Sequence, residues 1–212
     1  MAKIKSLSEQ VYDYIVYKIK IGELLFDEKI NETDLIDQLG ISRTPIREAL
    51  IQMSSDGILE NIPRKGFFVK SISNQKISEV YKIIGVLDAY AIKLAMPNIT
   101  KEHLRRLSAA IEKIDLAIEK KNYELYCNWQ EEFHLIYLEA CGNNSLVEII
   151  QSIERKNIRT TFYSESLDKL FIVLAKVNDE HRAILKSIEE KDSEKAAQLL
   201  NKHWGANFPD VV

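Results

Sequence analysis

Residues 41–50, ISRTPIREAL, place a proline between two arginines inside a short apolar frame. A proline ring disrupts a helix interior but is tolerated in the first turn, where the backbone N–H groups have no intrahelical acceptor. Pro45 therefore indicates that a helix begins near Ser42, a residue type that can cap it. Residues four apart share a helix face, so Arg43 and Arg47 project together from the N-terminal turn of this helix.

The residues before this segment predict two further helices. Apolar residues recur at helical spacing over 7–21 and end at a glycine, which indicates a first helix. Asn31 is a suitable N-cap for a second, short helix over 31–39. Gly40 follows where a left-handed C-cap favours glycine, so we expect a tight turn into the helix of residues 41–50.

The residues after Gly57 predict a β-hairpin. Their apolar period changes to two over 58–62 and again over 67–70, and a basic turn at 63–66 separates the two runs. Helix, helix, tight turn, helix and basic hairpin is the order of a winged helix-turn-helix. We expect this domain to occupy residues 1–72.

A basic surface in this window predicts binding to double-stranded DNA. In helix-turn-helix proteins the N-terminal end of the second helix enters the major groove, where guanidinium groups bind guanine or phosphate. Arg43 and Arg47 lie at that end, and Arg64 and Lys65 at the hairpin turn would reach the DNA backbone or the minor groove. The whole chain has a net charge of −3, so the prediction depends on this focused patch. Two arginines on a helix are most often a solvated face, but here cap, turn glycine, spacing and hairpin occur together.

The chain from residue 73 onward shows no strand pattern and predicts a helical bundle over 73–212. Seven glycines and four prolines are too few to punctuate many strands, which favours a mainly α protein. Short loops between the helices imply antiparallel neighbours. The expected helices are 74–97, 100–121, 123–141, 144–165, 168–190 and 192–208.

The remaining composition favours a cytoplasmic protein. No apolar run approaches the ~20 residues of a membrane helix, and the amino terminus lacks the apolar region of a secretory signal. Cys127 and Cys141 are fourteen residues apart in one expected helix, about 21 Å along its axis. Because that separation exceeds disulfide reach, we expect two free, buried thiols in a reducing compartment.

Three of the four histidines fall on the apolar faces of three different bundle helices: His134, His181 and His203. His103, in a charged first turn, is expected at the surface. A single histidine on an apolar face is more often a hydrogen-bonded core residue than a metal ligand. Three that converge on one interior instead predict a site for a zinc-class ion, since neutral imidazoles are good ligands for such metals.

The amino-terminal region resembles a known family. INETDLIDQLGISRTPIREALIQMSSDGILENIPRKGFFV is similar to the DNA-binding domain of GntR-type bacterial transcription regulators. The resemblance implies that Arg43 and Arg47 read the operator, that Thr44 supports them, and that Gly66 lets the wing approach DNA. Some members have an arginine in the second helix where this chain has Thr33, so their base preference does not transfer.

The carboxyl-terminal region resembles the FadR-type ligand-binding domain known as FCD, an antiparallel helical bundle. The matching segments are EEFHLIYLEACGNNSL, NDEHRAILKSI and AAQLLNKHW. Members often bind a divalent metal through three histidines, here His134, His181 and His203, and an aspartate four residues before the first. That position is Gln130 in this chain. Three possibilities stay open: three imidazoles with water, a fourth ligand from Glu131, or no metal.

These features together predict a homodimeric regulator, in the resembling family most often a repressor, that binds a pseudo-palindromic operator. One winged helix reads too few base pairs for useful specificity, and a dimer doubles the site. A zinc ion on three neutral imidazoles would carry one more positive charge than one that also binds an aspartate, which favours a small carboxylate effector. A second feature of the resembling family, an arginine in the first bundle helix just ahead of a Leu-acid pair, is absent, because Ile84 lies three residues before Leu87-Asp88. The resemblance therefore implies no particular effector.

Two other functions are compatible with parts of this sequence. The first is a constitutive DNA-binding dimer whose bundle takes neither metal nor effector. The second is a metal-dependent hydrolase, in which a metal-bound water attacks a substrate. The hydrolase lacks an H-E-x-x-H motif and leaves the DNA-reading domain unexplained. We therefore expect that the protein is not an enzyme.

Overall fold

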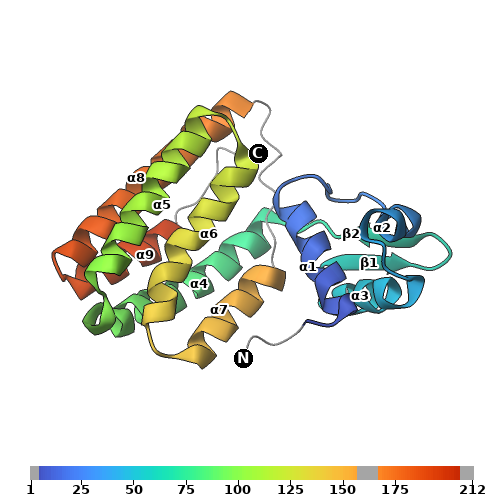
Figure 1. The fold of residues 1–212 in the computed structure, drawn as a ribbon, viewed down its shortest axis with the longest axis horizontal. Coiled ribbons are helices and arrows are strands. Elements are labelled where there is room, and N and C mark those ends of the chain that lie inside the picture. Colours follow the sequence, from blue (N-terminus) through green and yellow to red (C-terminus); the bar gives the residue numbers. More distant parts are fainter. Residues whose placement is uncertain (1–4, 157–166, 206–212) are drawn as a thin grey trace. The chain divides into compact units, whose positions relative to one another are not determined.

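The computed structural model describes residues 5–156 and 167–205, which form nine α-helices and one two-stranded sheet (Figure 1). The chain divides into two compact units. The first extends to Ser73 and the second begins at Asn74, except that Arg155 and Lys156 group with the first. The predicted fold class, a winged helix-turn-helix with a helical bundle, is confirmed. None of the described helices combines the length and apolarity needed to cross a lipid bilayer.

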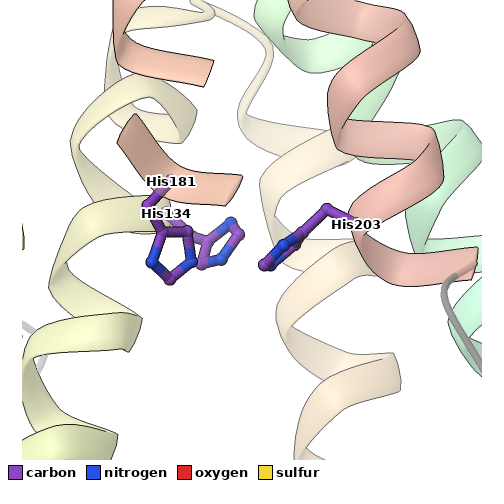
Figure 2. A group of neighbouring side chains, drawn as sticks. All are labelled: His134, His181 and His203. Atoms are coloured by element: carbon purple, nitrogen blue, oxygen red, sulfur yellow. The ribbon is translucent and has the colours of Figure 1, made fainter. Parts of the chain in front are cut away.

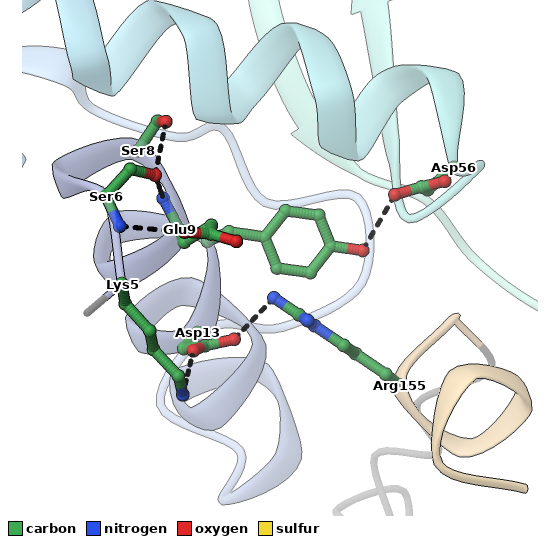
Figure 3. A network of polar contacts seen from close by, with 8 residues as sticks. Lys5, Ser6, Ser8, Glu9, Asp13, Asp56 and Arg155 are labelled. Atoms are coloured by element: carbon green, nitrogen blue, oxygen red, sulfur yellow. Dashed lines mark hydrogen bonds and ion pairs between the residues drawn. The ribbon is translucent and has the colours of Figure 1, made fainter. Parts of the chain in front are cut away.

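The first helix, α1 (Leu7–Lys20), begins with a capping box (Figure 3). The Ser6 hydroxyl accepts a hydrogen bond from the Glu9 N–H at 3.1 Å, and the Ser6 N–H donates to the Glu9 carboxylate at 2.7 Å. Further along α1, the Tyr12 hydroxyl donates to the Asp56 carboxylate at 3.0 Å. Burial raises the pKa of Tyr12, so the phenol keeps the proton that makes this bond.

The helix-turn-helix consists of α2 (Glu32–Leu39) and α3 (Arg43–Ser55). Gly40 ends α2 with φ 63°, the left-handed conformation that glycine adopts without strain. Ser42 occupies the N-cap position of α3 as predicted, but its side chain makes no capping hydrogen bond. Pro45 at the third helical position removes one of the two N–H groups from which a cap side chain usually accepts.

The hairpin pairs β1 (Leu59–Ile62) with β2 (Gly66–Val69) in antiparallel register, with Ile62 opposite Gly66. On its other side β2 is bonded by the loop after α1, where the Ile30 N–H donates to the Phe67 carbonyl at 2.8 Å. The sequence pattern did not predict this second contact. Strand β2 is therefore hydrogen-bonded along both of its edges.

The second unit is the predicted antiparallel bundle. α4 packs against α9 and α6, α5 packs against α6 and α8, and α8 packs against α9. Parts of two expected helices, residues 157–165 and 206–208, lie outside the described residues. Cys127 and Cys141 are buried and free, as predicted. The helices are α4 (Asn74–Ala95) with the 3-10 turn η1 (Met96–Asn98), α5 (Lys101–Glu119), α6 (Tyr123–Ala140), α7 (Asn144–Lys156), α8 (Leu167–Glu189) and α9 (Ser193–Gly205).

One glycine sets the distance between α4 and α9. A Cβ on Gly85 would lie 3.1 Å from the Trp204 Cβ and 3.2 Å from the Asn201 carbonyl oxygen. A side chain there would therefore push α9 away from α4. Because His203 precedes Trp204 on α9, this close packing also positions one of the three candidate metal ligands.

Candidate functional site

The first turns of α3 expose the residues that were predicted to read DNA. Arg43, Thr44 and Arg47 are exposed, whereas Ile46 on the opposite face is fully buried. The Arg47 Nε lies 3.9 Å from a Glu32 carboxylate oxygen, and the arginine side chain is 58% exposed. An exposed pair at that distance contributes little, so the guanidinium stays available for DNA.

The wing tip presents the other predicted residues. Arg64 and Lys65 are exposed, and the Lys65 N–H closes the turn by donating to the Ile62 carbonyl at 3.0 Å. Arg64 has φ 66° and Gly66 has φ 102°. A Cβ on Gly66 would meet only the Lys29 Cε, at 3.5 Å. The backbone conformation, rather than a lack of space, therefore favours glycine at this position. Contacts of these residues with DNA stay a prediction.

In the second unit, three helices bring His134, His181 and His203 together (Figure 2). Their possible ligand atoms all lie within 4.8 Å of one another, and the three side chains are at most 6% exposed. The ring centroids are 4.8 to 5.3 Å apart. The predicted convergence of the three histidines thus occurs within the described residues.

The hydrogen bonds of His134 fix its tautomer. Its Nδ1 lies 2.6 Å from the Tyr137 hydroxyl, and this hydroxyl donates to Asp88 Oδ2 at 2.6 Å. Burial and the neighbouring Asp88 raise the pKa of Tyr137 well above its ordinary value, so the hydroxyl stays protonated. Since that single proton is used on Asp88, His134 must donate its own Nδ1 proton to the tyrosine oxygen. Its Nε2 then carries the lone pair.

His181 has the same tautomer for a different reason. The Asn178 amide nitrogen donates to the Ile111 carbonyl at 3.2 Å and to Asp115 at 2.8 Å. The amide oxygen of Asn178 therefore faces His181 Nδ1, at 3.2 Å, and accepts its proton. Again the lone pair is left on Nε2.

His203 completes the set. Its Nδ1 lies 2.8 Å from a Glu180 carboxylate oxygen. An ionised carboxylate has no proton to donate, so it acts as the acceptor of this hydrogen bond. All three imidazoles therefore have a hydrogen-bond acceptor at Nδ1, which leaves Nε2 as the potential ligand atom. In known metal sites, ligating histidines are held in this way by a carboxylate or carbonyl on the other ring nitrogen.

The structure leaves two of these ligand atoms without any hydrogen-bond partner. Within the described residues, Nε2 of His134 and Nε2 of His181 are buried and unpaired. Buried polar atoms are rarely left in this state, so the pattern differs from that of ordinary core histidines. Burial also lowers the pKa of His134 and, well below its usual value, that of His181. Neutral imidazoles with free lone pairs fit a divalent metal such as zinc.

No fourth ligand joins this group among the described residues. Gln130 is half-buried and Glu131 is exposed, and the grouped ligand atoms come from the three histidines alone. A role for either residue stays a prediction. His103 lies apart from the site, because its Nδ1 accepts the Thr100 N–H at 3.1 Å in the capping box of α5.

Sequence reasoning missed the residues behind the ligands. Asn178 and Tyr137 each lie three residues from the histidine that they contact, so helical spacing could have identified them. Asp88, which also accepts from the Trp204 indole at 2.6 Å, and Glu180 reach the site across helices. Their roles require the packing of the bundle and have no local signal.

Each of the two units matches a known protein family. Residues 7–69 match the family described as bacterial regulatory proteins, gntR family, and residues 79–206 match the FCD domain. The chain is 30% identical over 185 residues to the Nta operon transcriptional regulator of Aminobacter aminovorans, covering 87% of this chain and 85% of that protein.

Two further relatives extend the likeness over nearly the whole chain. A "Probable D-xylose utilization operon transcriptional repressor" of Paenarthrobacter nicotinovorans is 28% identical over 204 residues, which cover 96% of this chain and 88% of that one. The solved structure of E. coli McbR/YncC superimposes with a TM-score of 0.82 at 25% identity and covers 98% of both chains. These relatives are transcription regulators rather than enzymes. The chain belongs to the GntR family of DNA-binding bacterial transcription regulators and carries a C-terminal FCD domain.

Proposed function

We propose that the chain is a homodimeric repressor whose affinity for a pseudo-palindromic operator is set by a small carboxylate effector, bound beside a divalent metal in the bundle. The observation that carries the proposal is the set of three buried imidazoles whose Nδ1 atoms are all engaged. This arrangement leaves three Nε2 lone pairs for one ion. A protein that reads bacterial DNA works in the cytoplasm.

His134, His181 and His203 would hold the ion. A zinc-class ion on three imidazoles offers an open coordination position that suits a carboxylate. Asp88 and Glu180 lie behind two of the ligands and bring negative charge near the site without occupying that position. These two carboxylates offset part of the positive charge that the missing aspartate would leave on the ion. The preference for a carboxylate effector therefore depends more on the open coordination position than on the net charge of the site.

On the DNA side, Arg43 and Arg47 would read base edges in the major groove with Thr44 beside them. Residues 64–66 of the wing would contact the phosphate backbone or the minor groove. The exposure of these side chains supports the assignment. Repression is supported by the relative from Paenarthrobacter nicotinovorans, whose name describes a repressor.

Control of DNA binding requires two states of the dimer that differ in effector affinity. An effector that binds one state more tightly shifts the population towards it, and the two half-sites of the operator then fit better or worse. By linkage, operator DNA must change the effector affinity by the same factor.

Elemental analysis of protein purified without chelators tests the metal site. We expect one ion per chain in the parent protein and none in His181→Ala. His103→Gln is the matched control, because glutamine can keep the α5 capping box while the histidine lies outside the site. A substoichiometric metal content in the parent would contradict the metal site and favour a constitutive DNA-binding dimer.

Selection of bound sequences from random DNA tests the dimer. Two inverted half-sites at a fixed spacing are expected from two-fold symmetry. An asymmetric site would contradict a symmetric dimer, whatever the metal content.

A further inference from the structure

The exposed face of α3 carries one large apolar side chain among its polar residues. Ile51 is 58% exposed, whereas Ile46 and Leu50 on the opposite face of the same helix are fully buried. Single exposed apolar residues are common on protein surfaces and need no explanation by themselves. The position of Ile51 distinguishes it, because the same face carries the arginines that are proposed to read DNA.

Helix geometry places Ile51 close to the centre of this face. At about 100° per residue, it lies about 40° around the helix from Arg47 and about 20° from Thr44, which is two turns earlier. Thr44 and Ile51 therefore lie nearly opposite the buried residues of α3. In homeodomains the residues that contact bases are spaced three, four and seven positions along the recognition helix. Counted from Thr44, the last of these positions is Ile51, and both residues are exposed.

The side chains on this face differ in length. Thr44 and Ile51 are short and lie at its centre, whereas Arg43 and Arg47 are long and lie on one flank. The Arg47 Nε lies 3.9 Å from a Glu32 carboxylate oxygen, so this arginine leans towards α2. A helix with short central side chains can lie deep in a major groove that is about 12 Å wide. The long flanking arginines can then reach bases or phosphates to the side.

The chemistry of the central residues favours a contact with base edges over a contact with phosphates. Ile51 has no hydrogen-bonding group in its side chain. Glu48, which is exposed on the other flank, carries charge of the same sign as a phosphate. Neither side chain stabilises a contact with the DNA backbone, which is bound through positive charge and hydrogen-bond donors. Among the base edges of the major groove, thymine presents a methyl group that suits an apolar side chain.

We propose that Ile51 determines base preference by packing against the C5-methyl group of a thymine in each half-site of the operator. The inference rests on the proposed reading of DNA by α3 and adds to it one residue and the base that it selects. Arginine contacts select guanine or hold a phosphate, whereas a methyl contact selects thymine over cytosine at one further position. In a symmetric operator the contact occurs once in each half-site.

Deoxyuridine in place of thymidine tests the DNA side of the contact. It removes the methyl group and keeps the base pairing and every hydrogen-bonding group of the base. Selection of bound sequences from random DNA first gives the half-site, and each thymine is then replaced in turn in both half-sites. Burial of one methyl group corresponds to about 4-fold in affinity. At one thymine the replacement should therefore weaken wild-type binding by about 15-fold over two half-sites, measured by fluorescence anisotropy.

Ile51→Ala tests the protein side of the contact. At that thymine the variant should bind the thymidine and deoxyuridine operators equally, because alanine is too short to pack against the methyl group. The matched control is Ile172→Ala, at an α8 side chain that is 61% exposed and lies in the second unit. It should show the same 15-fold dependence on the methyl group as the wild type, again to within about 2-fold. Thermal melting of both variants checks that they fold.

Selection from random DNA with Ile51→Gln gives an independent measurement. A glutamine side chain bonds to adenine N6 and N7 and has no affinity for a methyl group. The base preference should therefore change at the one position that Ile51 reads in each half-site. The preferences at the other positions should stay as in the wild type, because Arg43 and Arg47 are unchanged. An unaltered preference for thymine at every position would contradict the proposal.

The outcomes separate this contact from the proposed function. A selected operator that the wild type binds equally well with thymidine and with deoxyuridine overturns the role of Ile51 and leaves the DNA-binding regulator standing. A methyl dependence that Ile51→Ala retains in full does the same, because another residue then contacts the methyl group. A wild type that selects no sequence from random DNA overturns both the contact and the proposed recognition of an operator.

Discussion

The two candidate sites differ in their exposure to solvent. The DNA-reading face places Arg43 and Arg47 in solvent, where their charge is available for an outside polyanion. The histidine site buries its imidazole rings, and the Nδ1 atom of each ring faces a hydrogen-bond acceptor. A surface that binds by charge needs only the right helix face, whereas a buried site needs every polar atom placed by its surroundings. Without an effector, a change at one site should therefore leave binding at the other site unaltered.

The largest expected effect comes from the reading face. Arg43→Ala combined with Arg47→Ala removes two contacts worth about 1–3 kcal/mol each, so operator binding should weaken by roughly 30-fold to 10⁴-fold. Zinc affinity and melting temperature should not change, since both side chains are exposed. Fluorescence anisotropy with operator DNA measures the loss. Arg105→Ala, at an exposed α5 arginine paired with Glu102, should bind DNA as the wild type does.

A smaller effect is expected behind the metal ligands. Glu180→Gln keeps an acceptor for His203 but removes the negative charge, and loss of such a supporting group typically lowers metal affinity by about 10–100-fold. Competition with a chromophoric chelator measures the zinc affinity. Glu189→Gln, at an exposed position of the same helix, is the control. Equal zinc affinity in Glu180→Gln and wild type would show that Glu180 does not support the site.

The smallest effect concerns the packing that positions His203. Gly85→Ala introduces a Cβ 3.1 Å from Trp204, and overpacking of this kind typically costs about 1–3 kcal/mol. The melting temperature of the bundle should fall, and zinc affinity should fall with it. Gly205→Ala is the control, because a Cβ there meets nothing within 4 Å. Without metal or effector, Gly85→Ala should bind operator DNA as metal-free wild type does. A loss of DNA binding in this variant would show that the packing of α4 on α9 affects the DNA-reading face directly.

The sequence was sufficient to predict the features that depend on residues close together in the chain. Pro45, Gly40 and the change of period after Gly57 were sufficient to locate the helix-turn-helix and the wing, because each acts within a few residues. The apolar stripes likewise placed three histidines inside the bundle. In both cases the information is carried by spacing along one element.

Long-range geometry could not be predicted in the same way. Which ring nitrogen of His134 carries the proton depends on Asp88, which is 46 residues earlier in the chain and acts through Tyr137. The pairing of the Ile30 backbone with the wing crosses a loop without a strand pattern.

The central claim is that the histidine site controls DNA binding. The most direct test is the operator affinity of zinc-loaded protein across a panel of small carboxylates, measured for wild type, His181→Ala and zinc-free wild type. At least one carboxylate should change the wild-type dissociation constant by about 5- to 150-fold, the usual range of such coupling. The change should be absent in His181→Ala and without zinc. The account is contradicted if no carboxylate alters DNA binding, or if the same change persists in both of these samples.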